Sequence, residues 1–258
     1  MNLKLERTER VATVTLNRPD VRNAFNEDLI AELTATFTTL AKDEGLRAIV
    51  LAAEGKAFCA GADLNWMRAM SSYSWEENHA DAVRLAEMLW TIYSCPVPVI
   101  AKVQGDAYAG GVGLVSVCDI VVATENAGFC LSEAKLGLLP ATIAPYVVRA
   151  LGEQASRRYF VTAERFSAQE AQRLGLVHEL AMTGNLDEKV NALVNPLCAN
   201  GPAAVRACKR LVQDVAHATV TAALRDDTAR RIADIRASEE GRAGVQSFLG
   251  KTPAPWLS

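Results

Sequence analysis

Hydrophobic and polar residues alternate along the chain with two different periods. In Val11–Leu16, apolar and polar side chains alternate one by one, as in a half-buried strand. From Asn26, a helix N-cap residue, to Leu40, the apolar residues recur at helical spacing. Ala48–Ala52 is wholly apolar, which favours a strand buried on both faces. The pattern therefore predicts alternating strands and helices.

The stretch Val99–Ala144 repeats this pattern and adds a pair of glycines. Val99–Val103 is an apolar strand, and the Gln104–Gly105 break lets the chain turn over Ala107–Ala109 into Gly110–Gly111. Glycines that open a helix present amides without an intrahelical acceptor and allow a ligand to approach closely. The pattern predicts that an anionic oxygen binds at this turn.

A second turn with free amides is expected within Lys56–Leu64. Gly61 breaks a strand end, and Asp63 then caps the next helix. Ser71–Glu77 has weak periodicity, which is typical of a surface loop or a mobile segment over a site. A helix over Ala80–Tyr93 follows it.

The C-terminal part of the chain is mostly helical. Residues 144–162 predict two helices, and Leu176–Leu180 predicts one more short strand. From Leu186 onward the pattern is almost entirely helical and rich in Ala, Arg and Leu. The composition shifts near residue 200, so we expect a core over 1–199 and a helical segment over 200–258.

Composition and charge exclude several classes of partner. The 258 residues are 50% hydrophobic and 22% charged, which is enough apolar sequence for a large core. A net charge of −3 with scattered basic residues gives no general attraction to nucleic acid or to an anionic membrane. No apolar run is long enough to span a bilayer, and the N-terminus lacks the apolar region of a signal peptide. A cytoplasmic location is expected.

Motifs for metal, disulfide and nucleotide chemistry are missing from the sequence. The six cysteines form no C-x-x-C pair and are expected to be reduced, and the three histidines have no metal-ligand spacing. No G-x-S-x-G or G-K-[ST] occurs, and the dinucleotide pattern counted from Gly111 fails because Ser116 occupies its last place. We therefore expect neither a metal nor a redox cofactor.

Glu133 is the candidate catalytic acid. It follows a strand among apolar residues, a setting that raises the pKa of a carboxyl towards the range where it both takes and gives a proton. Two amides, near Ala62 and Gly110, suit a carbonyl oxygen that gains charge during reaction, which implies enolate chemistry. The alternatives are a helix-capping or Lys135-paired glutamate and two ordinary tight turns.

These residues resemble the enoyl-CoA hydratase/isomerase, or crotonase, superfamily over nearly the whole chain. The matching segments are NRPDVRNAFN, KAFCAGADLNWM, AGGVGLVSVCDIVVA, FCLSEAKLGLLP and EEGRAGVQSFLGKTPAPW. The resemblance implies an α/β fold with a crotonase-like spiral of ββα units. It also implies a helical C-terminal oligomerisation segment that builds a homotrimer, commonly paired as a hexamer.

The resemblance assigns roles residue by residue. Ala62 and Gly110 match the two positions whose N–H groups hold the thioester oxygen, and Glu133 matches a catalytic glutamate. The substrate is then an acyl-CoA thioester, with coenzyme A as part of the substrate rather than a separate cofactor. The expected contacts to substrate and coenzyme A are Arg22, Ala24, Ala60, Asp63, Leu64, Phe248 and Lys251.

Gly113 departs from the pattern of the two-glutamate hydratases, which carry a second catalytic glutamate there. A Δ3,Δ2-enoyl-CoA isomerase needs only the base at Glu133, and a non-catalytic acyl-CoA-binding protein needs neither. Longer matches, such as LSEAKLGLLPATIAPYVV, look most like bacterial methylglutaconyl-CoA and isohexenylglutaconyl-CoA hydratases, in which that glycine also appears. We therefore expect a hydratase for a short or branched acyl-CoA of glutaconyl type. Gly113 should leave space, so that a second group or the carboxylate of the substrate itself orients the water, with Asp106 and Tyr108 as nearby candidates.

Overall fold

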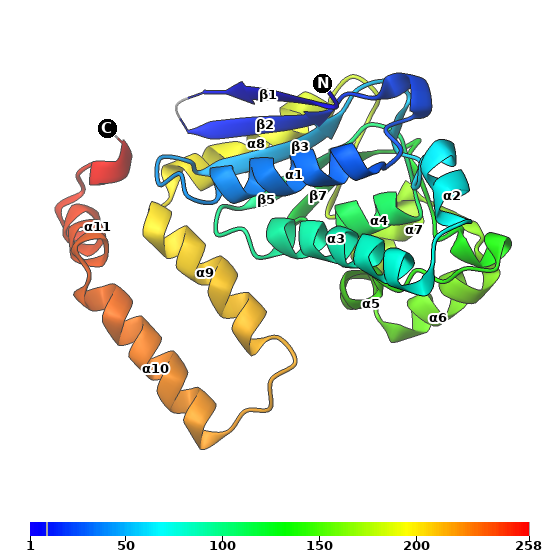
Figure 1. Cartoon of the computed structure of the whole chain (residues 1–258). Coiled ribbons are helices and arrows are strands. Elements are labelled where there is room, and N and C mark those ends of the chain that lie inside the picture. The colour runs from blue at the N-terminus through cyan, green and yellow to red at the C-terminus, as the bar shows by residue number, and fades with distance from the viewer. Residues whose placement is uncertain (9, 258) are drawn as a thin grey trace. The chain divides into compact units, whose positions relative to one another are not determined.

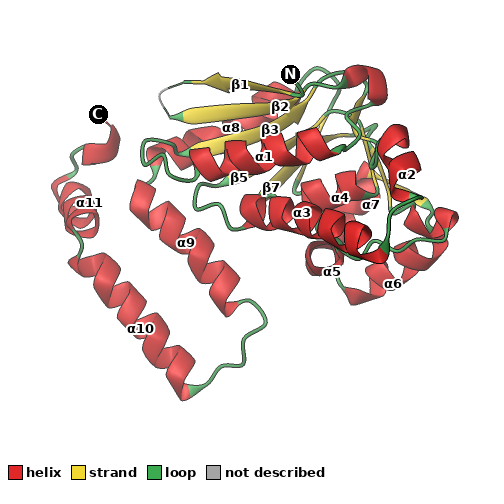
Figure 2. Cartoon of the chain, in the orientation of Figure 1, coloured by secondary structure: helices red, strands yellow, loops and turns green. Residues whose placement is uncertain are grey.

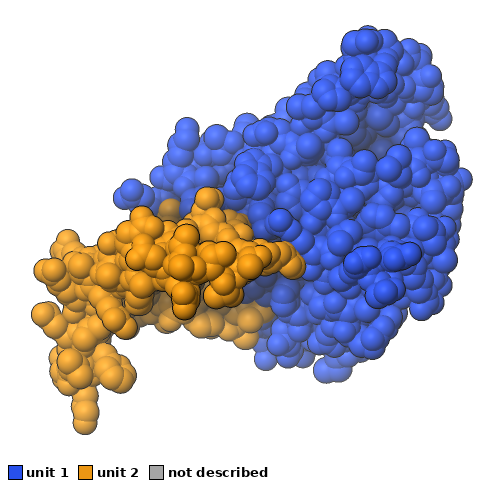
Figure 3. All heavy atoms as spheres, turned by 90° about the horizontal axis from the view of Figure 1, so that it is seen from below, with its two compact units in different colours: residues 1–191 blue, residues 192–258 orange. Residues whose placement is uncertain are grey.

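The computed structural model describes residues 1–8 and 10–257. It divides into two compact units, Met1–Asn191 and Ala192–Ser258, coloured blue and orange in Figure 3. The division falls inside helix α8 (Leu186–Ala199), ahead of the boundary after residue 199 that composition predicts. Each unit is described separately.

The first unit is built on a six-stranded sheet, shown in yellow in Figure 2. Its strands, in spatial order, are β1 (Leu3–Arg7), β2 (Val11–Leu16), β3 (Ala48–Ala53), β5 (Val99–Val103), β7 (Ile120–Thr124) and β10 (Glu179–Ala181). Only the β1–β2 pair is antiparallel among these. The wholly apolar β3 lies inside the sheet between β2 and β5, which explains why its sequence does not alternate.

Two amphipathic helices pack on each other in this unit, α1 (Glu27–Leu40) and α3 (Trp75–Tyr93) (Figure 1). Helix α1 begins at the predicted cap, because the Asn26 side chain accepts a hydrogen bond from the Leu29 amide at 3.0 Å. Its buried residues are the apolar positions of the helical repeat, Leu29, Ile30, Leu33, Phe37 and Leu40. The other helices of the unit are α2 (Leu64–Met70), α4 (Gly110–Ser116), α5 (Ala144–Leu151), α6 (Glu153–Thr162) and α7 (Ala168–Leu174).

A second, four-stranded sheet carries the candidate site. Its order is β4 (Ala57–Cys59), β6 (Asp106–Tyr108), β8 (Gly128–Cys130) and β9 (Arg165–Ser167). Strands β4, β6 and β8 are parallel, and β9 is antiparallel to β8. Because parallel strands point the same way, the chain leaves all three at the same edge of the sheet.

One strand was missed, and three local expectations were wrong. Strand β1 was not predicted, and residues 106–108 form strand β6 rather than part of the turn before Gly110. Helix α3 begins at Trp75 instead of Ala80, because Ser74 and Glu77 form a reciprocal capping box inside the expected loop. The last strand covers Glu179–Ala181 and so begins later than Leu176.

The second unit contains the helices α9 (Pro202–Val215), α10 (Ala222–Ala237) and α11 (Glu239–Gly250). None of the residues described in these helices is buried. Apolar and polar side chains line a cavity of about 390 Å³ between α9 and α10, including Leu211 and Ile232. No helix in the described part of the chain is both long and apolar enough to cross a membrane.

Candidate active site

Three turns meet at the edge where β4, β6 and β8 end, and each carries one of the predicted catalytic residues. Ala62 follows β4, Gly110 follows β6 and Glu133 follows β8. Backbone contacts join the turns: the Ala109 amide donates to the Cys130 carbonyl at 2.8 Å, and a Cβ on Gly61 would lie 3.0 Å from the Ala109 Cβ. The structure therefore brings the turns of the three predicted residues together.

The Ala62 amide is left free by the way Phe25 pairs with this turn. Phe25 donates to the Gly61 carbonyl at 2.7 Å and accepts from the Asp63 amide at 2.8 Å, so it bonds to both neighbours of Ala62. In this parallel arrangement the N–H of Ala62 itself points away from Phe25. Within residues 1–8 and 10–257, no acceptor for that N–H is found.

The Gly110 amide is free for a different reason. Gly110 is the first residue of α4, so its N–H has no intrahelical acceptor, and the described residues supply no other. The preceding Ala109 has φ 49° and ψ −121°, a strained conformation for a residue with a Cβ. The Phe25 ring lies against Gly110, where a Cβ would come within 3.0 Å of Cε2. Phe25 thus contacts both amide-bearing turns.

The Glu133 carboxyl is desolvated and partly unpaired. Its Oε2 is buried and has no hydrogen-bond partner in the described structure. Burial raises the pKa of Glu133, and a hydrogen bond from its own backbone N–H only partly offsets this. No ion pair with Lys135 occurs among the described residues. A half-buried carboxyl with one unpartnered oxygen and a raised pKa has the properties of a general acid/base.

Gly113 does not leave space for a water-orienting group, contrary to the expectation. A Cβ at Gly113 would lie 2.1 Å from Ile143 Cγ2, so the isoleucine fills the volume that any side chain at this position needs. Asp106 is also not a free water-orienting group. Its carboxylate accepts from the Gly128 amide at 2.8 Å and from Arg165 at 2.9 Å.

Tyr108 lies in a cavity of about 220 Å³ that it shares with Arg22, Lys56 and Ala60. Burial raises the pKa of Tyr108, and the charge of Asp106 adds to the effect. Arg22 and Lys56 are exposed cations on two different loops, which gives this cavity two positive charges beside one carboxylate. Lys56 was not predicted as a residue of the site, although its place directly before β4 was a usable signal.

Asn23 anchors the loop that carries Arg22 and Ala24. Its side chain is fully buried, accepts from the Arg18 amide at 2.9 Å, and donates to the carbonyls of Glu54 and Ala57 at 2.8 and 3.0 Å. Ala24 is buried on this loop. Asn23 is therefore a structural residue of the site that the sequence analysis did not identify.

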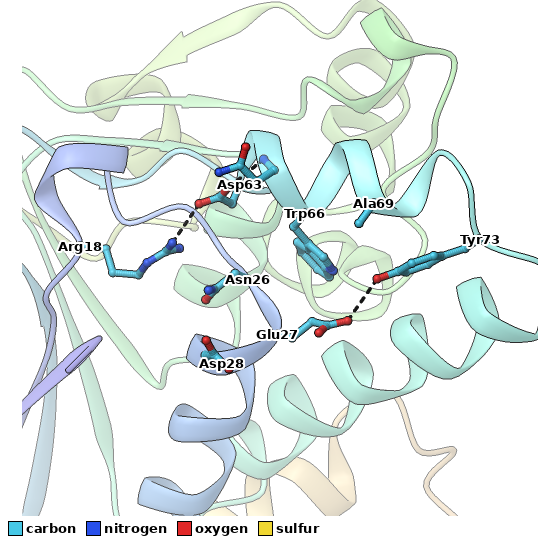
Figure 4. A pocket seen from close by; sticks show the side chains of 9 residues that line it. Arg18, Asn26, Glu27, Asp28, Asp63, Trp66, Ala69 and Tyr73 are labelled. Carbon is cyan, nitrogen blue, oxygen red and sulfur yellow. Dashed lines mark hydrogen bonds and ion pairs between the residues drawn. The ribbon is translucent and has the colours of Figure 1, made fainter.

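The side chain of Asp63 is occupied by protein contacts. It accepts from the Asn65 amide at 2.8 Å as the cap of α2, and from Arg18 at 2.9 Å. Burial works to raise the pKa of Asp63, but these two donors outweigh it and hold the pKa below its usual value. Figure 4 shows this ion pair in a separate polar cavity of about 250 Å³, which also contains Glu27, Trp66 and Tyr73.

Three other predicted contact residues are exposed. Leu64 begins α2 and is 69% exposed, and Phe248 in α11 of the second unit is 83% exposed. Lys251 caps the end of α11 with φ 54°. Their roles in binding stay predictions.

The titratable side chains do not gather into a metal site. Over residues 1–8 and 10–257, no group of three or more His, Cys, Asp or Glu side chains is placed to hold a metal ion. The six cysteines form no disulfide bond in the described structure, and four of them are buried.

Comparison with known proteins identifies the family. The enoyl-CoA hydratase/isomerase family model matches residues 6–258, and the chain belongs to that family. An enoyl-CoA hydratase structure from Shewanella pealeana ATCC 700345 is 40% identical, with a TM-score of 0.96 over 99% of this chain and 96% of that one. A Mycobacterium smegmatis enoyl-CoA hydratase structure is 38% identical, with a TM-score of 0.94 over 100% of both. The predicted crotonase-like α/β fold is confirmed.

A curated relative has a more specific name. The 2,3-dehydroadipyl-CoA hydratase of Escherichia coli strain K12 is 31% identical over 253 residues, covering 96% of each chain.

Proposed function

We propose that this protein is an enoyl-CoA hydratase that adds water to, or removes it from, a short or branched acyl-CoA thioester of glutaconyl type. The observation that carries the proposal is the buried Glu133 Oε2, which has no partner among the described residues. Glu133 lies on a turn at the same sheet edge as the free amides of Ala62 and Gly110. Family membership supports the acyl-CoA substrate. The E. coli relative, named for a dicarboxylic acyl group, supports a substrate with a second carboxylate.

In the proposed mechanism the two amides bind the thioester oxygen, and Glu133 moves the proton. Glu133 takes a proton from water while the water oxygen bonds to C3 of the enoyl group. The electron pair of the double bond moves towards the thioester oxygen, where the amides of Ala62 and Gly110 stabilise the enolate. Glu133 then returns the proton to C2. Dehydration follows the same steps in reverse.

The cavity lined by Arg22, Lys56 and Ala60 is the proposed site for the phosphate-bearing part of coenzyme A. Two exposed cations on separate loops suit a ligand with several negative charges. Ala24 lies on the loop fixed by Asn23 and is proposed as a backbone contact. Phe248 and Lys251 are proposed to reach coenzyme A in an assembly, which we propose to be a trimer or hexamer in the cytoplasm.

One observation favours a second candidate, a Δ3,Δ2-enoyl-CoA isomerase. Among the carboxyl side chains on the three turns that meet at the described sheet edge, only Glu133 has an oxygen without a partner. No second acid can come from position 113, because Ile143 fills that space. One base is enough to move a proton between C2 and C4, whereas water addition also needs the water to be held.

Product identification by mass spectrometry on a panel of 2-enoyl- and 3-enoyl-CoA esters separates these functions. With a hydratase, the product is heavier than the substrate by one water, and the enoyl-thioester absorbance is lost. An isomerase produces a 2-enoyl ester of unchanged mass. Turnover of no ester, with equal binding by wild type and Glu133→Gln, would instead indicate a non-catalytic acyl-CoA-binding protein.

A further inference from the structure

Gly113 and Ile143 form a close steric pair between helices α4 and α5. A Cβ on Gly113 would lie 2.1 Å from Ile143 Cγ2 and 2.6 Å from its Cβ. Both distances are shorter than atoms of real side chains approach. Ile143 is only 1% exposed, so the pair is closed to solvent.

The isoleucine cannot move aside at low cost. The two clashing atoms belong to the branched base of the side chain, and β-branched residues have a restricted χ1 angle. The backbone around Ile143 is also fixed, because the Val147 amide donates to the Ile143 carbonyl and the Ala144 amide donates to the Pro140 carbonyl, both at 3.0 Å. A side chain at position 113 would therefore require α4 and α5 to separate.

One residue of the pair lies on the same short helix as a proposed oxyanion-binding amide. Gly113 is one helical turn after Gly110, and residues three apart are neighbours on a helix surface. Ile143 follows Glu133 along the segment that begins with the 3₁₀ turn Glu133–Leu136. Just after this turn, the Leu138 amide donates to the Glu133 carbonyl at 3.1 Å. The space that a side chain at position 113 would take, one turn after the oxyanion-binding amide, is thus filled by hydrocarbon.

We propose that Ile143 is a reaction-specificity determinant: by packing on Gly113 it excludes a second proton-transferring side chain from α4 and makes Glu133 the only acid/base of the site. This inference rests on the proposed function. It predicts that hydration of an unbranched enoyl-CoA, which gains from a second carboxyl that holds the water, is limited by Ile143 rather than by Glu133.

The decisive experiment compares Gly113→Glu, Ile143→Gly and the double variant on but-2-enoyl-CoA. Ile143 is replaced by glycine because alanine would keep the Ile143 Cβ, which lies 2.6 Å from the place that a Cβ at position 113 would take. The change removes no helix cap, because the Ile143 side chain makes no capping hydrogen bond at the start of α5. We expect the double variant to hydrate but-2-enoyl-CoA with a kcat at least about tenfold above either single variant, a gain within the usual range for one acid/base group, while KM changes little. A Gly113→Glu single variant as active as the double would overturn the inference.

Thermal melting tests the steric pair independently of activity. Gly113→Ala is expected to lower the melting temperature by roughly 5 °C through overpacking. In the background of Ile143→Gly, the further change Gly113→Ala should lower the melting temperature much less. Val148→Ala, at an exposed position of the same helix, is the matched control and should not rescue it. Additive effects of Gly113→Ala and Ile143→Gly would refute the pairing.

The two proposals fail in different ways. If the wild type hydrates no ester in the panel, the proposed function is wrong, and the melting experiment still tests whether Ile143 excludes a side chain at position 113. If the wild type is active and the double variant gains nothing over the single variants, the specificity role of Ile143 is wrong.

Discussion

The two units differ in how they use their apolar residues. In the first unit, strands such as β3 and β5 are almost entirely buried, and the sheets hold three chemically distinct turns at one edge. In the second unit, α9, α10 and α11 bury none of the residues described, and Val212, Phe248 and Leu249 are 64%, 83% and 74% exposed. The first unit completes its own core, whereas the second presents apolar side chains to its surroundings.

This difference indicates a division of labour. A buried, fully packed core holds backbone amides and a carboxyl at fixed positions, as proton transfer and oxyanion stabilisation require. Exposed apolar surface on an amphipathic helix is typical of a face that another protein surface covers. The first unit is therefore the expected source of the chemistry, and the second the expected source of self-association.

The largest effect is expected at Glu133 in the first unit, and a glutamate of the second unit serves as its control. Glu133→Gln should reduce turnover about 10³-fold, on the order of 4 kcal/mol in the barrier, because the amide cannot transfer the proton. Glu240, which accepts from the amides of Ala203 and Ala204 at 3.0 and 2.9 Å, is the matched control. Glu240→Gln should cost about 1 kcal/mol of stability and leave kcat nearly unchanged. Steady-state kinetics and thermal melting measure both.

The second prediction concerns assembly. Ile232 is 47% exposed and lines the cavity between α9 and α10. Ile232→Asp should weaken self-association at least tenfold, about 1.4 kcal/mol, because a charge in a covered apolar face is left unpaired. Light scattering across a concentration series measures this. Ala233→Asp, at the neighbouring exposed position, is the control, and an equal effect of both changes would contradict the assignment of this face.

The third prediction concerns the pH dependence of activity. The base must be ionised, and burial raises the pKa of Glu133 above its ordinary value of 4.5. The acid limb of kcat/KM against pH is therefore expected above pH 4.5, with activity lost as pH falls through the raised pKa. An acid limb at or below pH 4.5 in a protein that remains folded would show that Glu133 is not the titrating base.

The smallest effect is expected at His178, which joins β10 to β7. Its Nδ1 accepts from the Val121 amide at 2.9 Å, and desolvation lowers the pKa of His178, although Asp119 and Glu179 oppose this and the residue reaches solvent. Because the folded pKa lies below the unfolded value of 6.5, the contribution of neutral His178 to the free energy of unfolding is present above pH 6.5 and is lost as the pH falls through the folded pKa. His178→Asn, which keeps a hydrogen-bond acceptor, should reduce the change in melting temperature between pH 7.5 and pH 5. His217→Asn in the second unit should not.

The sequence predicts elements best where one periodicity dominates. The strand Val11–Leu16 and the helix from Asn26 to Leu40 agree with the structure, because their buried side chains follow a single repeat. Helix α3 began earlier than expected because its first turns are exposed and polar, so the start is set by the Ser74–Glu77 capping box rather than by apolar spacing. Strand β6 was read as a turn because three residues are too few to show an alternation.

For the candidate site, the sequence identifies residues but not their surroundings. Gly110 and Glu133 carry local signals, a helix-opening glycine and an acid among apolar residues. The filled space at Gly113 carries none, because Ile143 approaches it through the packing of two separate helices. In the same way, the anchoring of Asn23 depends on carbonyls from a distant loop, which no local pattern reveals.

Phe25 contacts both turns that carry the free amides, through its backbone at Gly61 and Asp63 and through its ring at Gly110. One residue thus couples the two hydrogen-bond donors, because its main chain holds the first turn and its ring packs on the second. A smaller side chain at this position would leave a void beside Gly110 and loosen the second donor without touching the first.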